Sequence, residues 1–138
     1  MNLSLFLNKY TGQKVDFDNA FGFQCVDLFR QYTKDVLNAP HTGAVEGAKD
    51  LFLNYLNLPL EQKYYKKVST NFPEAGDVCI WNGTPSNKYG HVAICINRIS
   101  DTKILVFEQN GITQDGAKFS IRSNINLLGV LRPLTSVI

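Results

Sequence analysis

Long apolar runs are missing from this sequence, and none approaches the roughly 20 residues that a membrane-spanning helix needs. An excess of one charge is missing too, because 14 Lys and Arg stand against 12 Asp and Glu, for a formal net charge of +2. A protein that binds nucleic acid mainly through charge carries a basic stripe. We therefore expect neither a membrane nor a nucleic acid as partner. The N-terminal residues lack a basic leader and a small-residue cleavage site, which predicts no signal peptide.

Cysteine is scarce and scattered along the chain. Its three positions are Cys25, Cys79 and Cys95, and no two of them form a CxxC pair. This excludes a disulfide scaffold and a zinc ribbon, and it favours synthesis in a reducing compartment. The 138 residues, 44% of them hydrophobic, are enough to bury one core without such staples. Since the chain has no repeat and no linker, we expect a single domain over residues 1–138.

The hydrophobic spacing changes from helical to extended along the chain. It predicts a helix from Leu3 to Tyr10, closed by Gly12, and an amphipathic helix from Cys25 to Leu37. A weaker pattern predicts a further helix from Ala44 to Tyr55. The second half instead predicts short strands, over the segments Asp77–Trp81, His91–Ile96 and Ile104–Glu108, with weaker ones near Phe119–Ile121 and Gly129–Leu131. N-terminal helices packed on a C-terminal antiparallel β-sheet make this an α+β fold.

One of the three cysteines stands at a position suited to chemistry. Cys79 and Cys95 lie inside apolar strand segments and are interpreted as small core residues. Cys25 stands where a loop becomes a helix, and the unpaired backbone N–H groups there favour a thiolate, which is the nucleophilic form. Position alone leaves a structural role for Cys25 open.

A nucleophilic cysteine needs a base, and the chain has two histidines. His41 follows Pro40 and is interpreted as a solvated loop residue. His91 opens an apolar strand, which would hold its ring rigidly at the end of the sheet. Glu108 and Asn110 end the neighbouring apolar segment two residues apart, so an extended backbone would project both from one face, toward the base. The alternative is that this segment is merely entering a turn.

Four short motifs occur in one order: Phe21–Asp27, Gly76–Val78, Gly90–Ala93 and Glu108–Asn110. This ordered set resembles the CHAP domain family, the cysteine- and histidine-dependent amidohydrolases and peptidases. Its closest likeness is to the catalytic domains of endolysins from phages of Gram-positive bacteria. The resemblance covers nearly the whole chain and implies a papain-like fold of the NlpC/P60 type.

The resemblance also implies roles for individual residues. Cys25 would be the nucleophile and His91 the general base, while Glu108 would orient His91 and Asn110 would complete a tetrad. The backbone N–H of Cys25 would donate to the oxyanion, and Gln24 would line the same site or serve the preceding loop. Trp81 is assigned to the substrate groove, with a plain core position as the equal alternative.

An acidic stretch precedes the candidate nucleophile. Carboxylates at Asp16, Asp18 and Asp27 fall at positions 1, 3 and 12 of an EF-hand register, with Ala20 and Gly22 placed to offer main-chain oxygens. The glycine and glutamate usual at positions 6 and 12 are absent, so spacing alone leaves an acidic surface loop as the alternative. Some staphylococcal-type CHAP domains resemble this stretch and bind calcium, which implies one structural Ca²⁺ here.

The function that the resemblance implies is hydrolysis of peptidoglycan through an acyl-enzyme. The bond would be the N-acetylmuramoyl-L-alanine amide or a peptide bond of the stem or cross-bridge. The alternatives are a non-catalytic module that binds cell wall or builds a phage particle, and a cysteine peptidase acting on proteins. We expect a monomer that is made in the host cytoplasm and acts on the bacterial wall after release.

Overall fold

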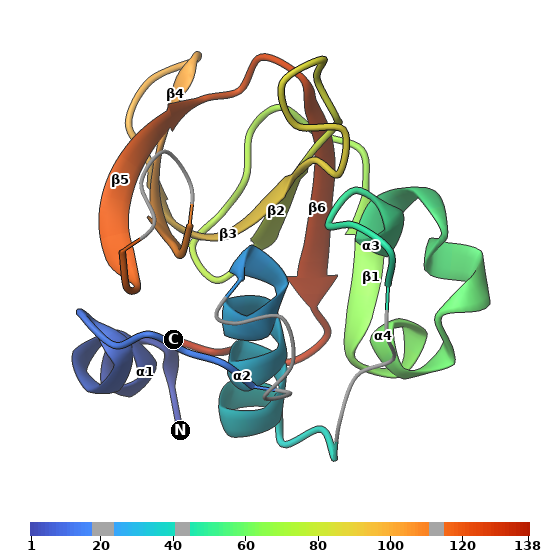
Figure 1. Ribbon diagram of the computed structural model, residues 1–138. Helices are drawn as coiled ribbons and strands as arrows, with labels where there is room; N and C mark the ends of the chain where they lie inside the picture. Colours follow the sequence, from blue (N-terminus) through green and yellow to red (C-terminus); the bar gives the residue numbers. More distant parts are fainter. Residues whose placement is uncertain (18–23, 41–44, 111–114) are drawn as a thin grey trace.

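The computed structural model describes residues 1–17, 24–40, 45–110 and 115–138 (Figure 1). Its helices are α1 (Leu3–Tyr10), α2 (Cys25–Leu37), α3 (Asp50–Leu53), the 3₁₀ turn η1 (Tyr55–Asn57) and α4 (Pro59–Tyr64). Its strands are β1 (Tyr65–Val68), β2 (Val78–Trp81), β3 (His91–Arg98), β4 (Lys103–Glu108), β5 (Lys118–Ser123) and β6 (Leu127–Pro133).

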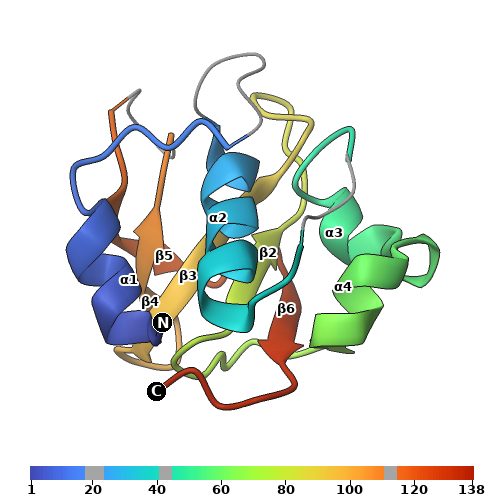
Figure 2. The ribbon, with the colours of Figure 1, turned by 90° about the horizontal axis from the view of Figure 1, so that it is seen from below.

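The strands form one six-stranded sheet in the order β1-β6-β2-β3-β4-β5, and the pairing is antiparallel throughout. In Figure 2 the helices lie on one side of this sheet, with α2 in front of β2 and β3. The predicted α+β fold is therefore confirmed.

The sheet carries a hydrophobic core on each face, because alternate residues of a strand point in opposite directions. Val78 and Ile80 of β2 join the core beneath the helices, while Cys79 and Trp81 join a second core on the other face. A strand buried on both faces has no polar side to its pattern, which explains why β2 and β3 are nearly continuous apolar runs.

Helix α2 positions its first residue through a buried apolar face. Leu28, Phe29, Val36 and Leu37 are all buried in the core against the sheet, together with Tyr32, whose hydroxyl donates to the Gly76 carbonyl over 2.8 Å. The helix stops at Asn38, which adopts the left-handed backbone conformation with φ 58°. The predicted bounds of α1 and α2 are both confirmed.

The helix predicted from Ala44 to Tyr55 is mostly wrong. Residues 46–49 form bends and turns, and only Asp50–Leu53 is α-helical before the 3₁₀ turn. Gly47 lies so close to Tyr89 that a Cβ on it would be 2.9 Å from the Tyr89 carbonyl oxygen. The Lys49 N–H donates to that same oxygen. The backbone of this segment therefore contacts the 82–90 loop instead of forming a helix.

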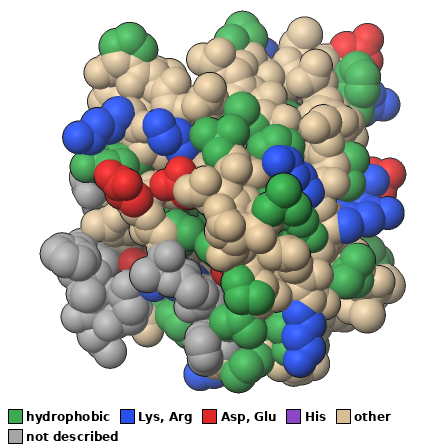
Figure 3. Space-filling model, turned by 90° about the vertical axis from the view of Figure 1, so that its right-hand side faces the viewer, with side chains coloured by type: hydrophobic (Ala, Val, Ile, Leu, Met, Phe, Trp, Pro, Cys, Tyr) green, Lys and Arg blue, Asp and Glu red, His purple; other side chains and the backbone are tan. Residues whose placement is uncertain are grey.

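The two ends of the chain lie side by side. The Leu3 N–H donates to the Val137 carbonyl over 2.7 Å, and Figure 2 shows both termini at the same edge of the molecule. On the face shown in Figure 3, hydrophobic, basic and acidic side chains are interspersed, so no stripe of one charge crosses that face. Within the described ranges, no helix combines the length and apolar character needed to cross a membrane.

Candidate active site

Cys25 is the first residue of α2, and a hydrogen bond fixes the backbone just before it. Gln24 is the extended N-cap residue, and its N–H donates to Oδ2 of the buried Asp27 over 2.9 Å. Cys25 is half-buried, whereas Cys79 and Cys95 are fully buried, and all three are free thiols. Cys25 is therefore the cysteine that a substrate can reach.

His91 is the first residue of β3, and the glycine before it lies close to the backbone of β2. The preceding Gly90 has φ 77°, and a Cβ on it would lie 2.4 Å from the Trp81 carbonyl oxygen, so glycine is required there. The His91 ring is buried and 5.8 Å from the Trp81 ring, its neighbour across the β2–β3 pair. Strand pairing thus fixes the ring at the end of β3 that lies near the start of α2.

The two nitrogens of His91 face different partners. Nε2 lies 3.0 Å from Oε1 of Glu108, which leaves Nδ1 for the Cys25 thiol. Burial lowers the pKa of His91, but hydrogen bonds with Cys25 and Glu108 outweigh burial, and the net pKa is raised. The surroundings therefore favour the imidazolium ion that a thiolate–imidazolium pair requires.

Glu108 is 1% exposed and is held between His91 and Arg122. Arg122 donates from Nε to Oε1 and from Nη2 to Oε2, the latter over 3.4 Å. Burial alone would raise the pKa of Glu108, but the hydrogen bonds from His91 and Arg122 lower it to about 2. Glu108 is therefore a carboxylate at neutral pH, and Arg122 is a member of the site that the sequence analysis missed.

Asn110 does not continue the strand that carries Glu108. Strand β4 ends at Glu108, and Asn110 is a half-buried residue with φ 53° in the left-handed region. The expectation that the backbone stays extended from Glu108 to Asn110 is therefore wrong, and the segment enters a turn as the alternative had it. The assignment of Asn110 to a tetrad stays a prediction.

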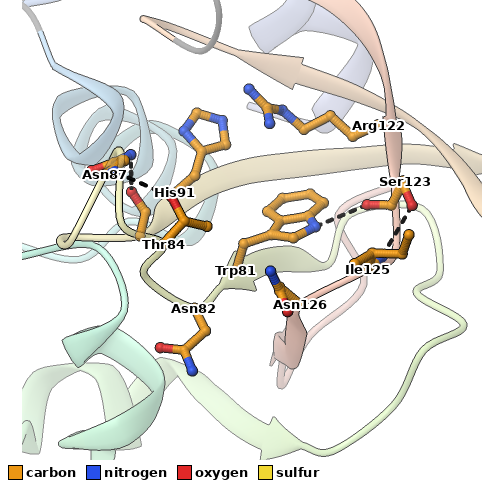
Figure 4. Close-up of a pocket in the computed structure, with 10 residues that line it drawn as sticks. Trp81, Asn82, Thr84, Asn87, His91, Arg122, Ser123, Ile125 and Asn126 are labelled. Carbon is orange, nitrogen blue, oxygen red and sulfur yellow. Dashed lines mark hydrogen bonds between the residues drawn. The ribbon is translucent and has the colours of Figure 1, made fainter.

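A cleft of about 300 Å³ opens beside His91 (Figure 4). It is lined by Trp81, Asn82, Thr84, Asn87, Gly90, His91, Arg122, Ser123, Ile125 and Asn126. The Trp81 indole donates from Nε1 to the Ser123 carbonyl over 3.0 Å, and the Arg122 guanidinium lies 5.6 Å from its ring centroid. Trp81 thus belongs to the second core and lines the cleft as well, and its assignment to a substrate groove stays a prediction.

The predicted calcium loop is described only at its two ends. Asp18, Ala20 and Gly22 lie outside the described residues, as does His41. Asp16 has a buried Oδ1 atom with no hydrogen-bond partner among the residues the structure describes, and Asp27 is buried. Across those same ranges, no three acidic, histidine or cysteine side chains gather into a metal-binding group. An orphaned buried carboxylate oxygen at Asp16 fits a cation ligand.

The family profile described as "CHAP domain" matches residues 14–110, which is more than half of the chain and includes every candidate residue of the site except Arg122. The chain belongs to the CHAP domain family. Its CHAP sequence is 33% identical, over 86 residues, to the endolysin PlyTW of Staphylococcus phage Twort (strain DSM 17442 / HER 48). That alignment covers 60% of this chain and 17% of PlyTW.

Solved structures share the fold of this CHAP domain. The wild-type endolysin LysIME-EF1 superimposes with a TM-score of 0.76 at 25% identity, over 94% of this chain and 61% of that one. Ly7917 superimposes with a TM-score of 0.70 at 18% identity, over 93% of this chain and 59% of that one, a likeness of fold alone. The CHAP domain described here is thus of the papain-like NlpC/P60 type, and the chain spans less than two thirds of these relatives.

Proposed function

We propose that this CHAP domain hydrolyses an amide bond of Gram-positive peptidoglycan with Cys25 as nucleophile. One observation carries the proposal. A half-buried cysteine at a helix N-terminus lies beside a buried histidine, and the other ring nitrogen of that histidine is hydrogen-bonded to an ionised glutamate. That arrangement activates a thiol and holds its base in one orientation. Similarity to phage endolysins supports the cell wall as substrate.

The proposed reaction proceeds in two halves. His91 accepts the Cys25 proton through Nδ1, and the thiolate attacks the amide carbonyl carbon. The backbone N–H of Cys25 faces the resulting oxyanion, with Gln24 beside it, and His91 then passes its proton to the leaving amine. Water, deprotonated by His91, hydrolyses the thioester and restores the thiol. Glu108 remains ionised and stabilises the imidazolium through Nε2.

The cleaved bond belongs to one of two classes. An N-acetylmuramoyl-L-alanine amidase and a stem or cross-bridge endopeptidase use the same reacting atoms and differ only in the groups that the cleft accepts. The amide and hydroxyl side chains of Asn82, Thr84, Asn87 and Asn126 suit the polar groups of either substrate. Mass spectrometry of fragments released from purified walls distinguishes the two: an amidase frees the lactyl carboxylate of muramic acid and the amino group of L-alanine, whereas an endopeptidase creates both new ends within the stem or cross-bridge peptide. A protein peptidase would release neither.

The first prediction concerns the nucleophile. Cys25→Ser should abolish the loss of turbidity of Gram-positive walls without changing the melting temperature, because an alcohol is a far weaker nucleophile than a thiolate. Cys79→Ser and Cys95→Ser are matched controls that should alter stability only, since both thiols are buried away from the cleft. Lysis by Cys25→Ser would contradict the assignment, and a wild type that binds walls without releasing fragments would identify a non-catalytic module.

The second prediction concerns calcium. We propose one structural Ca²⁺, with ligands from Asp16, Asp18 and Asp27 and from the main-chain oxygens of Ala20 and Gly22. The proposal is supported by Oδ1 of Asp16, which has no hydrogen-bond partner among the described residues. The ion would neutralise the clustered carboxylates and stabilise the backbone that leads into Cys25.

Chelation should therefore lower the melting temperature and the rate of wall lysis, and added Ca²⁺ should restore both because it binds only the native state. Magnesium should substitute poorly, since it demands octahedral geometry and dehydrates reluctantly. Asp18→Ala should lose the response, whereas Asp101→Ala, a control at an exposed turn, should keep it. A chelated protein with unchanged stability and lysis would contradict the site.

A further inference from the structure

Gln109 is a buried polar residue next to the candidate site, and it has no role in the proposed reaction. Its side chain is 1% exposed and makes three hydrogen bonds to backbone. Oε1 accepts from the Val15 N–H and Nε2 donates to the Val15 carbonyl, each over 2.7 Å. Nε2 also donates to the Gln24 carbonyl over 2.9 Å. One carboxamide thus joins the two ends of the segment that leads into Cys25.

Glu108 and Gln109 divide the site between them. Gln109 directly follows Glu108, the last residue of β4, and the two side chains make their contacts on opposite faces of the sheet. Glu108 reaches His91 and Arg122 on one face, whereas Gln109 reaches Val15 and Gln24 on the face covered by the helices. Two adjacent residues at the end of β4 therefore position both the base, His91, and the backbone that precedes Cys25.

The Gln24 carbonyl belongs to the same rigid peptide unit as the Cys25 N–H. A hydrogen bond that fixes the carbonyl therefore fixes the direction of that N–H as well. Accepting a hydrogen bond at the oxygen also polarises the peptide, which strengthens the N–H as a donor. The Asp27 N–H donates to the same oxygen over 3.1 Å, so two donors orient this peptide.

We propose that Gln109 is a positioning residue that aims the Cys25 N–H at the oxyanion of the reacting amide. The inference rests on the proposed function, and it deepens it by assigning the support of the oxyanion donor. Glutamine is suited to the position because the carboxamide supplies one acceptor and two N–H donors, and all three are used. Glutamate would place a second oxygen against two carbonyl oxygens.

Two substitutions test the proposal against a matched control. Gln109→Met keeps the approximate volume and removes all three hydrogen bonds, and Gln109→Glu keeps the shape and removes both donors. Tyr32→Phe is the control, because it deletes another buried hydrogen bond of the same core, at Gly76, away from the peptide of Cys25. Each variant is assayed for wall hydrolysis and for alkylation of Cys25 by iodoacetamide across pH, at equal folded fraction.

Alkylation needs the thiolate but forms no oxyanion, so it separates the two roles. Gln109→Met should lower kcat by about 10- to 100-fold, somewhat less than outright loss of an oxyanion donor. KM and the pH profile of alkylation should stay as in the wild type, and Tyr32→Phe should keep both rates. Hydrolysis at the wild-type rate, or hydrolysis and alkylation that fall together, would overturn the proposal.

A measurement on the unmodified protein covers the case in which neither variant folds. The Gln109 side-chain amide protons should exchange slowly with solvent and show NMR contacts to Val15 and Gln24. Rapid exchange of those protons would overturn the inference while leaving the proposed function intact. Failure of the proposed function has a different signature, since the wild type itself would then release no wall fragments.

Discussion

At the scale of single residues, Arg122 sets the charge balance of the site. Glu108 is a buried carboxylate between the His91 imidazole ring and the Arg122 guanidinium. Burial lowers the pKa of His91, the hydrogen bonds with Cys25 and Glu108 raise it, and the positive charge of Arg122 adds a smaller lowering effect. Arg122 therefore helps to keep Glu108 ionised and opposes the rise in the pKa of His91.

Arg122→Gln should raise the pKa values of both Glu108 and His91, because it removes two hydrogen bonds and one positive charge. An NMR titration of His91 should accordingly move to higher pH, and wall hydrolysis should fall. Arg122→Lys keeps the charge, so the His91 titration should move less. A His91 titration that stays in place in Arg122→Gln would contradict this account.

The same substitution has a defined effect on stability. The pKa of Glu108 is lowered from 4.5 to about 2 in the folded protein, so its ionised form stabilises the fold above pH 4.5. This contribution is lost as the pH falls through that interval. The denaturant midpoint of Arg122→Gln should therefore lie below that of the wild type at pH 6, and the gap should narrow toward pH 2.

The sequence allowed prediction of Cys25, His91 and Glu108, since each stands at a boundary between a polar and an apolar segment. Arg122 and Gln109 gave no such signal. Arg122 reaches Glu108 only because β5 pairs with β4 in the register that sets it opposite Ile104. Gln109 bonds residues 94 and 85 positions away in the chain.

At the scale of elements, the entry into β3 depends on Gly90. Alanine there must adopt φ 77° and also displace the Trp81 carbonyl, which would lie 2.4 Å from the new Cβ. Gly12 is a matched control, because it has φ 82° with nothing within 4 Å of a Cβ. Gly12→Ala should cost about 1 to 2 kcal/mol of unfolding free energy, the cost of left-handed backbone alone.

Gly90→Ala should cost more than Gly12→Ala and should also lose wall hydrolysis, since His91 shifts with the strand. Denaturant unfolding and the rate of turbidity loss measure both effects. Equal stability losses in the two variants, with activity retained in both, would show that the close contact at Trp81 does not constrain His91.

Elements with a clear apolar pattern were predictable, and elements without one were not. Helix α2 and strands β2, β3 and β4 contain apolar residues at the spacing or in the runs that indicate a helix or a buried strand. Strand β1 and helix α4 were not predicted. β1 has two exposed lysines at its centre and owes its extended form to pairing with β6, a contact that local spacing does not encode.

At the scale of the whole molecule, the site lies where the two cores meet. Cys25 packs against the core beneath the helices, whereas Trp81 of the opposite face packs beside the His91 ring. The nucleophile and its base thus depend on different faces of one sheet. Substitutions in either core should therefore disturb the alignment of the thiol and imidazole before they unfold the domain.

The hydrogen bond between Leu3 and Val137 makes the fold nearly a closed ring of chain. A short glycine–serine link should join the two ends without strain, and the ring can then be opened between Ser100 and Asp101, at an exposed turn. The eight residues of β3, at about 3.3 Å each, set those new ends roughly 25 Å from His91. This circular permutant should fold, melt somewhat lower and still hydrolyse walls. A permutant that folds without activity would contradict this expectation.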